Sequence, residues 1–333
     1  MSGPGRLKSV AKRAVLASRA LRLIQKNGVA VLMYHSVKES PAEHANTLGG
    51  IVHSTSIFRQ QMEMLARRCT PVNMDDVLRF TQGEKNLPPQ CFAITFDDGY
   101  ADNLEIAAPI LEQLGIPGAF YITVGYIETA KLPWAVRVRY AFAKTKQKSW
   151  AAPNGASYSF GDPDARREAF AQACQHLSGL TGAEQESAVN QIEAQLDVAP
   201  VSQPDMMLKW DQVRTLAKRG HVVGSHTVSH PNLAHVKDDA NLRHELAESK
   251  RQLDAQLGAP VRHFSYPVPA LKPHWTPRTV EVSRDAGYAT AVTTNPGLVS
   301  RNDDPLSLHR VRPAYEMDEF KWVLESSLAG RAV

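Results

Sequence analysis

Short apolar runs alternate with amphipathic stretches along most of this 333-residue chain. Val29–Tyr34 and Cys91–Phe96 are typical of buried strands, because each run is short, apolar and followed by polar residues. Asp239–Leu257 is long, rich in charge and followed by Gly258, as expected of a helix that ends at a glycine. The alternation therefore predicts a parallel sheet with helices on the outside.

Several chemically reactive side chains follow the carboxyl ends of the predicted strands. Asp97 and Asp98 come directly after Cys91–Phe96, and His226 and His230 follow another short apolar stretch. In a closed parallel barrel these strand ends meet at one mouth, which carries the active site. The sequence therefore predicts that the two pairs lie together, although more than a hundred residues separate them.

One aspartate and two histidines form a ligand set suited to Zn²⁺ or a similar divalent ion. Such a set leaves a coordination position open for water or substrate, and the second aspartate is then free to act as a base. Asp-Asp-Gly alone is also a turn signal, and His-x-x-x-His alone is a weak motif. Together, after strands of one alternating sheet, the two motifs predict metal-assisted hydrolysis.

The alternation is interrupted between about residues 126 and 208. Residues 154–164 are polar and rich in turn-forming side chains, and residues 166–196 have the apolar spacing of two helices. We expect a mostly helical insertion between two strands and not a separate catalytic unit. Trp134, Arg137 and Arg139, near its start, could line a substrate groove; the alternative for Trp134 is that it packs the insertion onto the sheet.

The composition is that of a soluble globular enzyme, with 43% hydrophobic and 22% charged residues. The formal net charge of +4 comes without a basic stripe interleaved with aromatics, so we expect no nucleic-acid partner. Cys69, Cys91 and Cys174 show no CxxC spacing, which argues against a disulfide framework or a thiolate metal site.

The first 28 residues carry seven lysines and arginines and no acidic residue. Arg19 and Arg22 interrupt the apolar run that a secretory signal needs, and no run reaches the roughly 18 apolar residues of a membrane span. We expect a basic helical extension over residues 1–28 that either contacts an anionic membrane surface or is a solvated terminal helix. The expected location is the cytoplasm, including the cytoplasmic face of the inner membrane.

Two complete motifs carry a resemblance to a known family. Residues 95–99 read Thr-Phe-Asp-Asp-Gly, and residues 226–230 read His-Thr-Val-Ser-His. With these motifs in this order, the chain resembles the polysaccharide deacetylases of carbohydrate esterase family 4, which share a NodB-like domain. The similarity covers roughly residues 29–313, and Met33-Tyr34-His35 resembles the branch that includes exopolysaccharide deacetylases. The resemblance implies a distorted (β/α) barrel of about seven strands, with residues 29–330 as one catalytic domain around the insertion.

The resemblance also implies roles for individual residues. Asp98, His226 and His230 would bind the metal, and Asp97 would be the catalytic base. Thr227 would brace the histidine loop through its hydroxyl. Substrate contacts are expected from four residues: Tyr100, Trp134, Tyr266 and Val268. A bound metal would polarise the acetamide carbonyl and lower the pKa of a water, whose proton Asp97 would accept.

Two departures from the family pattern concern the base and the acid. The third motif normally reads Arg-x-Pro-aromatic, but residues 265–268 read Ser-Tyr-Pro-Val, so another group must orient Asp97. The backbone N–H of Val268 could still serve the oxyanion. The fifth motif supplies a histidine acid after Leu-x, and here His309 is out of step by one. His35 is a second candidate, and without either Asp97 would return the proton itself.

We expect a metal-dependent hydrolase that removes N-acetyl groups from amino sugars of a bacterial surface polysaccharide, oligosaccharide or lipid-linked glycan. A second hypothesis is hydrolysis of a different C–N bond, such as deformylation of a lipid-linked sugar or opening of a small cyclic amide. A third is a sugar-binding relative without turnover. The missing arginine favours this third hypothesis, whereas the intact aspartate pair and histidine pair oppose it.

Overall fold

The computed structural model describes residue 12 and residues 20–40, 51–129, 131–199, 205–267 and 272–332. Most of the predicted basic N-terminal helix therefore lies outside the described residues; within them, Ala20–Ile24 forms a 3₁₀ helix. No helix in these ranges is long and apolar enough to cross a membrane. Membrane contact and a cytoplasmic location stay predictions.

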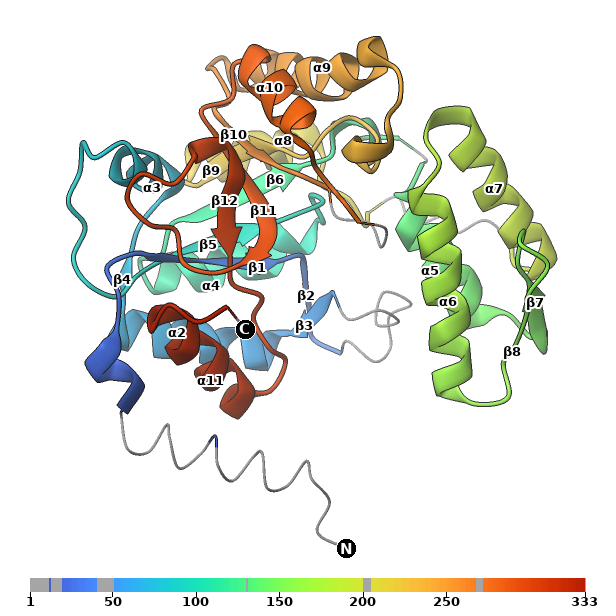
Figure 1. The fold of residues 1–333 in the computed structure, drawn as a ribbon, viewed down its shortest axis with the longest axis horizontal. Helices are drawn as coiled ribbons and strands as arrows, with labels where there is room; N and C mark the ends of the chain where they lie inside the picture. Colours follow the sequence, from blue (N-terminus) through green and yellow to red (C-terminus); the bar gives the residue numbers. More distant parts are fainter. Residues whose placement is uncertain are drawn as a thin grey trace, which may run out of the picture.

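Seven parallel strands follow one another around a nearly closed barrel within the described ranges (Figure 1). Their order is β1 (Val29–Tyr34), β5 (Cys91–Phe96), β6 (Gly118–Ile122), β9 (Val222–Ser225), β10 (His263–Ser265), β11 (Thr290–Pro296) and β12 (Leu308–Arg310). Directly after β12 the chain meets β1 in an isolated bridge, where Val311 N donates to Val31 O at 2.7 Å and Met33 N donates to Val311 O at 3.1 Å. The predicted distorted (β/α) barrel of about seven strands is confirmed.

The strands are apolar because both of their faces are buried, as in other parallel sheets. Val31 and Ala93 belong to the cluster of buried side chains inside the barrel. Their neighbours Leu32 and Ile94 belong to the cluster between the barrel and the outer helices. The alternation follows from the two-residue period of a strand, which sends successive side chains to opposite faces.

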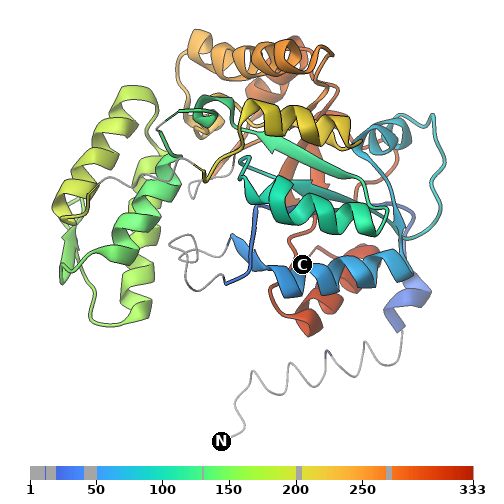
Figure 2. The ribbon, with the colours of Figure 1, turned by 180° about the vertical axis from the view of Figure 1, so that it is seen from behind.

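Helices surround the barrel (Figures 1 and 2). They are α2 (Thr55–Arg68), α3 (Met74–Thr81), α4 (Ala108–Gln113), α8 (Trp210–Lys218), α9 (Asp239–Leu257), α10 (Pro277–Asp285) and α11 (Met317–Leu328). Short 3₁₀ turns lie at Val124–Tyr126, Leu233–His235 and Pro305–Ser307. Three short strands complete the scaffold: β2 (Ser36–Lys38) pairs with β3 (Val52–Ser54), and β4 (Thr70–Pro71) pairs with β5.

The long helix predicted before Gly258 has the predicted bounds, and Gly258 adopts the left-handed conformation that ends it, with φ of 66°. A π-helical stretch, Asn103–Ala107, precedes α4. Pro109 has no N–H, so a regular α-helical ladder cannot continue through this segment.

The insertion forms a lobe at one side of the barrel in both views (Figures 1 and 2). It consists of α5 (Trp134–Lys144), β7 (Ser149–Ala151), β8 (Ser157–Ser159), α6 (Pro163–Ser178) and α7 (Gly182–Gln195). The lobe has its own core, in which the rings of Phe142 and Trp150 are 5.5 Å apart. The antiparallel β7–β8 hairpin was not predicted, because three-residue strands show too little periodicity to be recognised.

Candidate active site

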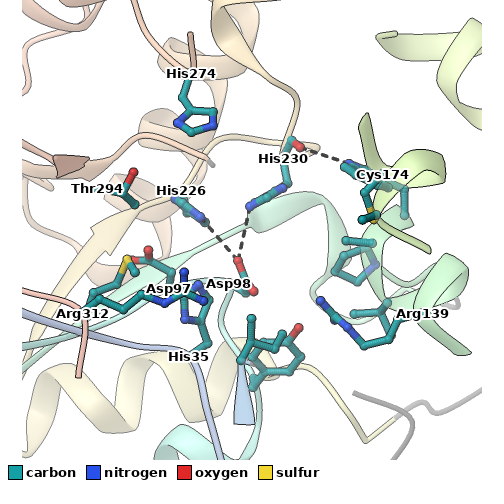
Figure 3. Close-up of a pocket in the computed structure, with 18 of the residues that line it drawn as sticks. His35, Asp97, Asp98, Arg139, Cys174, His226, His230, His274, Thr294 and Arg312 are labelled. Carbon is teal, nitrogen blue, oxygen red and sulfur yellow. Dashed lines mark hydrogen bonds and ion pairs between the residues drawn. The ribbon is translucent and has the colours of Figure 1, made fainter. Parts of the chain in front are cut away.

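The reactive side chains lie where β1, β5, β9 and β12 end, around a cavity of about 500 Å³ (Figure 3). Asp97, Asp98, His226 and His230 all line it, as their positions after strands predicted. Cavities of roughly 300–1,000 Å³ are typical of ligand-binding pockets. The parallel barrel therefore brings together side chains that are distant in the sequence.

Asp98, His226 and His230 form the candidate metal centre. Asp98 Oδ1 lies 3.4 Å from His226 Nε2 and 3.4 Å from His230 Nε2. The three ligand atoms lie within 4.8 Å of one another. Two ligands of a tetrahedral Zn²⁺, each at about 2.0–2.1 Å from the ion, are about 3.3 Å apart. The carboxylate–imidazole spacings therefore fit zinc.

The hydrogen bonds of this centre leave acceptor atoms facing one another. His226 Nδ1 lies 2.7 Å from Ser265 O and donates its proton there, which leaves the Nε2 lone pair directed at Asp98. Asp98 Oδ1 is buried and accepts no hydrogen bond from the described residues. A cation between these acceptors would remove their mutual repulsion.

The histidine loop, residues 226–230, has an unusual backbone conformation. Thr227 and His230 have φ of 70° and 59°, and Asp98 opposite them has φ of 77°, in the left-handed region that side chains disfavour. His230 N donates to Thr227 Oγ1 at 3.0 Å, which is the bracing contact expected of that hydroxyl. Strained conformations of this kind persist only where the surrounding structure holds them.

Glu245 of α9 is the main support of the histidine loop. Its Oε2 accepts hydrogen bonds from Val228 N and Ser229 N, both at 2.9 Å, and its Oε1 accepts one from Ser229 Oγ at 2.6 Å. On the other side, Gly125 N donates to Val228 O at 2.9 Å. A Cβ at Gly125 would lie 2.4 Å from that oxygen, so only glycine allows this approach. The loop is therefore clamped between a carboxylate and a tightly packed backbone.

Asp97 is held by Arg310 of β12 through a two-pronged ion pair. Nη1 donates to Oδ1 at 2.9 Å, and Nη2 donates to Oδ2 at 2.7 Å. Arg310 is itself fixed, since its Nε donates to Thr293 O at 2.7 Å and its Nη2 lies 3.3 Å from Ser265 Oγ. Asp97 is 2% exposed and Arg310 is 1% exposed. Arg310 thus orients Asp97 in place of the arginine that the family pattern has at position 265. The small serine at that position contacts Arg310.

The ion pair sets the charge of Asp97. Burial raises the pKa of this carboxyl, whereas the charges of Arg310 and His226 and the hydrogen bonds from Arg310 lower it, and the pKa lies below its ordinary value. Asp97 is therefore ionised at neutral pH. An ionised, oriented carboxylate beside the candidate metal centre is able to accept a proton from water.

His309, predicted as the acid, does not reach the cavity, and this assignment is corrected. Successive residues of a strand point to opposite faces, and Arg310 takes the inward position of β12. The side chain of His309 is 40% exposed and lies 3.8 Å from Asp303. In Leu308-His309-Arg310 the residue two after the leucine is the arginine, which accounts for the offset of one residue from the family pattern.

His35, the second candidate for the acid, does line the cavity and lies beside the two carboxylates in Figure 3. Asn103 Nδ2 donates to His35 O at 2.7 Å, and the buried Asp102 carboxylate binds the start of β2 just beyond. Burial lowers the pKa of His35, the charges of Asp98 and Asp97 raise it, and the result is below the ordinary value. His35 is thus fixed in the cavity as a neutral imidazole.

The four predicted substrate contacts fall in different places. Tyr100 and Trp134 line the cavity. Trp134 also packs the insertion onto the barrel, because it is 4% exposed and its Nε1 donates to His230 O at 3.4 Å. Tyr266 is corrected to a core residue: it is fully buried and its hydroxyl donates to Leu306 O at 3.0 Å. Val268 lies outside the described residues.

A (β/α) barrel with two histidines, one aspartate and a second, oriented carboxylate at its mouth is the arrangement of a hydrolase. The chain belongs to the polysaccharide deacetylase family, whose model, described as Polysaccharide deacetylase, matches residues 84–291. The family and the structural neighbours indicate that this chain is an N-deacetylase, a hydrolase that acts on carbon–nitrogen bonds other than peptide bonds.

Comparisons with individual proteins agree with this membership. "Putative polysaccharide deacetylase YxkH" of Bacillus subtilis (strain 168) is 22% identical over 282 residues, which cover 85% of this chain and 70% of that protein. The structure of Streptococcus pyogenes deacetylase PplD in complex with acetate has a TM-score of 0.60 at 19% identity, over 90% of this chain and 98% of that chain. The structure of IcaB from Ammonifex degensii has a TM-score of 0.60 at 20% identity, over 91% of this chain and 98% of that chain. The structural likenesses show a shared fold.

Arg310 and Glu245 were not predicted as site residues. The strand period offered a signal for Arg310, because it lies two residues after the buried Leu308 and one after His309. Glu245 offered none, since it is one of several charged residues on a long helix. Both roles depend on which helix or strand packs against the site.

The first prediction concerns Arg310. Arg310→Lys is expected to lower kcat for deacetylation about a hundredfold, because one ammonium group cannot hold both oxygens of Asp97 and a misplaced base loses about that factor. Metal content, measured by inductively coupled plasma mass spectrometry, should stay at the wild-type level, and thermal melting would verify the fold. An unchanged kcat would contradict the orienting role.

The second prediction concerns Glu245. Glu245→Gln is expected to weaken metal binding roughly 10–100-fold, because residues that support metal ligands typically contribute this much. Affinity would be measured by competition with a chromogenic chelator. Glu248→Gln on the same helix is the matched control, since its carboxylate pairs with Arg251 and not with the histidine loop. Equal metal affinities in the two variants would show that the clamp does not matter.

Proposed function

We propose that this protein removes N-acetyl groups from amino sugars in a bacterial surface glycan, and that it does so with Zn²⁺ held by Asp98, His226 and His230. The carrying observation is the ionised, Arg310-held Asp97 beside a buried two-histidine, one-aspartate centre in a single cavity. Support also comes from the PplD structure, whose bound acetate would be the product of such a reaction.

A bound Zn²⁺ would supply a polarised carbonyl and a water of lowered pKa. Residues of the chain move the protons and hold the base in position. Asp97 accepts a proton from the water as the water oxygen bonds to the acetamide carbon. The carbon–nitrogen bond then breaks, the nitrogen gains a proton, and acetate and a free amino sugar leave. Arg310 keeps both oxygens of Asp97 in place throughout.

The proton that reaches the departing nitrogen is the one that Asp97 takes from the water. We infer that His35 carries it. His35 lines the cavity, is fixed through its backbone, and lies beside Asp97 and Asp98 (Figure 3). His274 also lines the cavity, but Figure 3 shows it beyond the histidine pair and away from the carboxylates.

The third prediction tests the reaction itself. Purified protein loaded with Zn²⁺ is expected to release acetate from N-acetylglucosamine oligomers, and removal of the metal with a chelator should abolish release. Asp97→Asn should lose turnover but keep metal, whereas His226→Ala should lose both. Release of formate from a formylated, lipid-linked amino sugar, without acetate, would instead support a deformylase. Bound metal and sugar without any acyl release would support a binding protein.

The fourth prediction separates the two candidate acids. His35→Gln is expected to lower kcat by about 10²–10⁴, the usual contribution of a positioned proton carrier, with metal content unchanged. His309→Gln is the matched control and should leave kcat unchanged, because its side chain lies outside the cavity. If His35→Gln keeps the wild-type kcat, Asp97 returns the proton without help.

A further inference from the structure

The backbone around His35 is held by a single segment of the chain, residues 97–103, which follows β5. Just before this histidine, Asp97 N donates to Tyr34 O at 3.0 Å. At the histidine itself, Asn103 Nδ2 donates to the carbonyl oxygen at 2.7 Å. The segment that provides the base and one candidate metal ligand therefore also fixes the main chain that carries His35.

Asp102, in the same segment, holds the residues that follow His35 through both of its carboxylate oxygens. Oδ1 accepts a hydrogen bond from Val37 N at 3.0 Å, and Oδ2 accepts one from Ser36 Oγ at 2.7 Å. Lys38 Nζ lies 3.0 Å from Oδ2. Since β2 consists of these three residues, one carboxylate contacts every residue of the strand.

The placement of Asp102 is unfavourable for an anion. The residue is 1% exposed, and burial raises its pKa above the ordinary value, although the charge of Lys38 and the hydrogen bonds oppose the rise. A carboxyl group whose pKa is raised by folding is less stable as an anion in the folded protein than in water. Stability alone therefore does not favour an aspartate here, and a role in the reaction would explain it.

Asp102 can influence the reaction only through the residues that it holds, because it is not among the described residues that line the cavity. His35 does line the cavity, and Figure 3 shows its ring beside Asp97 and Asp98. A displacement of about 1 Å in a reacting group can lower a rate about a hundredfold. The contacts to the backbone of His35 are therefore placed where they control the position of its ring.

We propose that Asp102 is a positioning residue for deacetylation, which binds β2 and thereby holds the imidazole of His35 beside the two carboxylates of the cavity. Asn103 shares this role through the carbonyl oxygen of His35. The inference rests on the proposed function, in which His35 carries the proton from Asp97 to the departing nitrogen. Asp102 itself transfers no proton and contacts no substrate.

Kinetics of Asp102→Asn on Zn²⁺-loaded protein test the positioning role. The amide keeps the size of the carboxylate but replaces one acceptor oxygen with a donor. We expect kcat for acetate release to fall about 10–100-fold, with KM and metal content unchanged. Asp254→Asn is the matched control and should leave kcat unchanged, because Asp254 makes the same kinds of contact, to Val261 N at 2.6 Å and Lys250 Nζ at 2.7 Å, outside the cavity lining. A raised KM with wild-type kcat would show that Asp102 only supports the cavity wall, and would overturn the proposal.

A double-mutant cycle shows whether Asp102 acts through His35. In the His35→Gln background, Asp102→Asn is expected to lower kcat no further, because the group that it positions is already absent. Losses that multiply would show that Asp102 acts on another part of the site, and would contradict the proposal. Ser36→Ala is the milder variant if Asp102→Asn does not fold. It removes one hydrogen bond and should lower kcat roughly 2–10-fold, again only when His35 is present.

A measurement without substrate separates this inference from the proposed reaction. In NMR spectra of protein that carries isotope-labelled histidine, the ring signals of His35 are those that His35→Gln removes. Asp102→Asn is expected to shift or broaden these signals, whereas Asp254→Asn should leave them unchanged. Shifted signals without acetate release from any sugar would support the positioning role and refute only the reaction. Acetate release by the wild-type protein, with His35 signals that Asp102→Asn does not alter, would refute only the positioning role.

Discussion

The buried ion pair between Asp97 and Arg310 is the contact on which the rest of the site depends. An isolated charge inside the barrel would be neutralised, and removal of one partner from a buried pair typically costs about 3–5 kcal/mol. Arg310 also binds the backbone of Thr293 and the side chain of Ser265, so a single guanidinium connects β10, β11 and β12 with the aspartate that follows β5. The same contact that keeps Asp97 ionised therefore also ties the mouth of the barrel together.

Both the strands and the loops determine the geometry of the candidate metal centre. Parallel strands deliver Asp98 and the two histidines to the same end of the barrel, but the final positions of the ligand atoms depend on left-handed backbone at Asp98, Thr227 and His230. Glu245, Gly125 and Trp134 hold the histidine loop in that conformation. The strain at the site is thus opposed by contacts from α9, from the turn after β6 and from the insertion.

The barrel is common to relatives that share only about a fifth of their residues with this chain, as the structures of PplD and IcaB show. A fold that is shared at such low sequence identity says little about the glycan that is bound, because specificity depends on the side chains around the reacting atoms. In this chain the insertion between β6 and β9 supplies one wall of the cavity, including Trp134 and the buried Arg139. The lobe with its separate core is therefore part of the active site.

The sequence by itself determined the barrel and the positions of the candidate ligands and the candidate base, because strand periodicity and short motifs are local and can be recognised without knowledge of packing. Asp97, Asp98, His226 and His230 could be named from two motifs of five residues. Only the tertiary structure decided how Asp97 is oriented and which histidine shares its cavity. Arg310 instead of His309 faces inward, His35 and not His309 lines the cavity, and Tyr266 is a core residue. A shift of one residue along a strand exchanges the side chains that point to its two faces. The alignment of the strand is set by contacts between segments that are far apart in the chain.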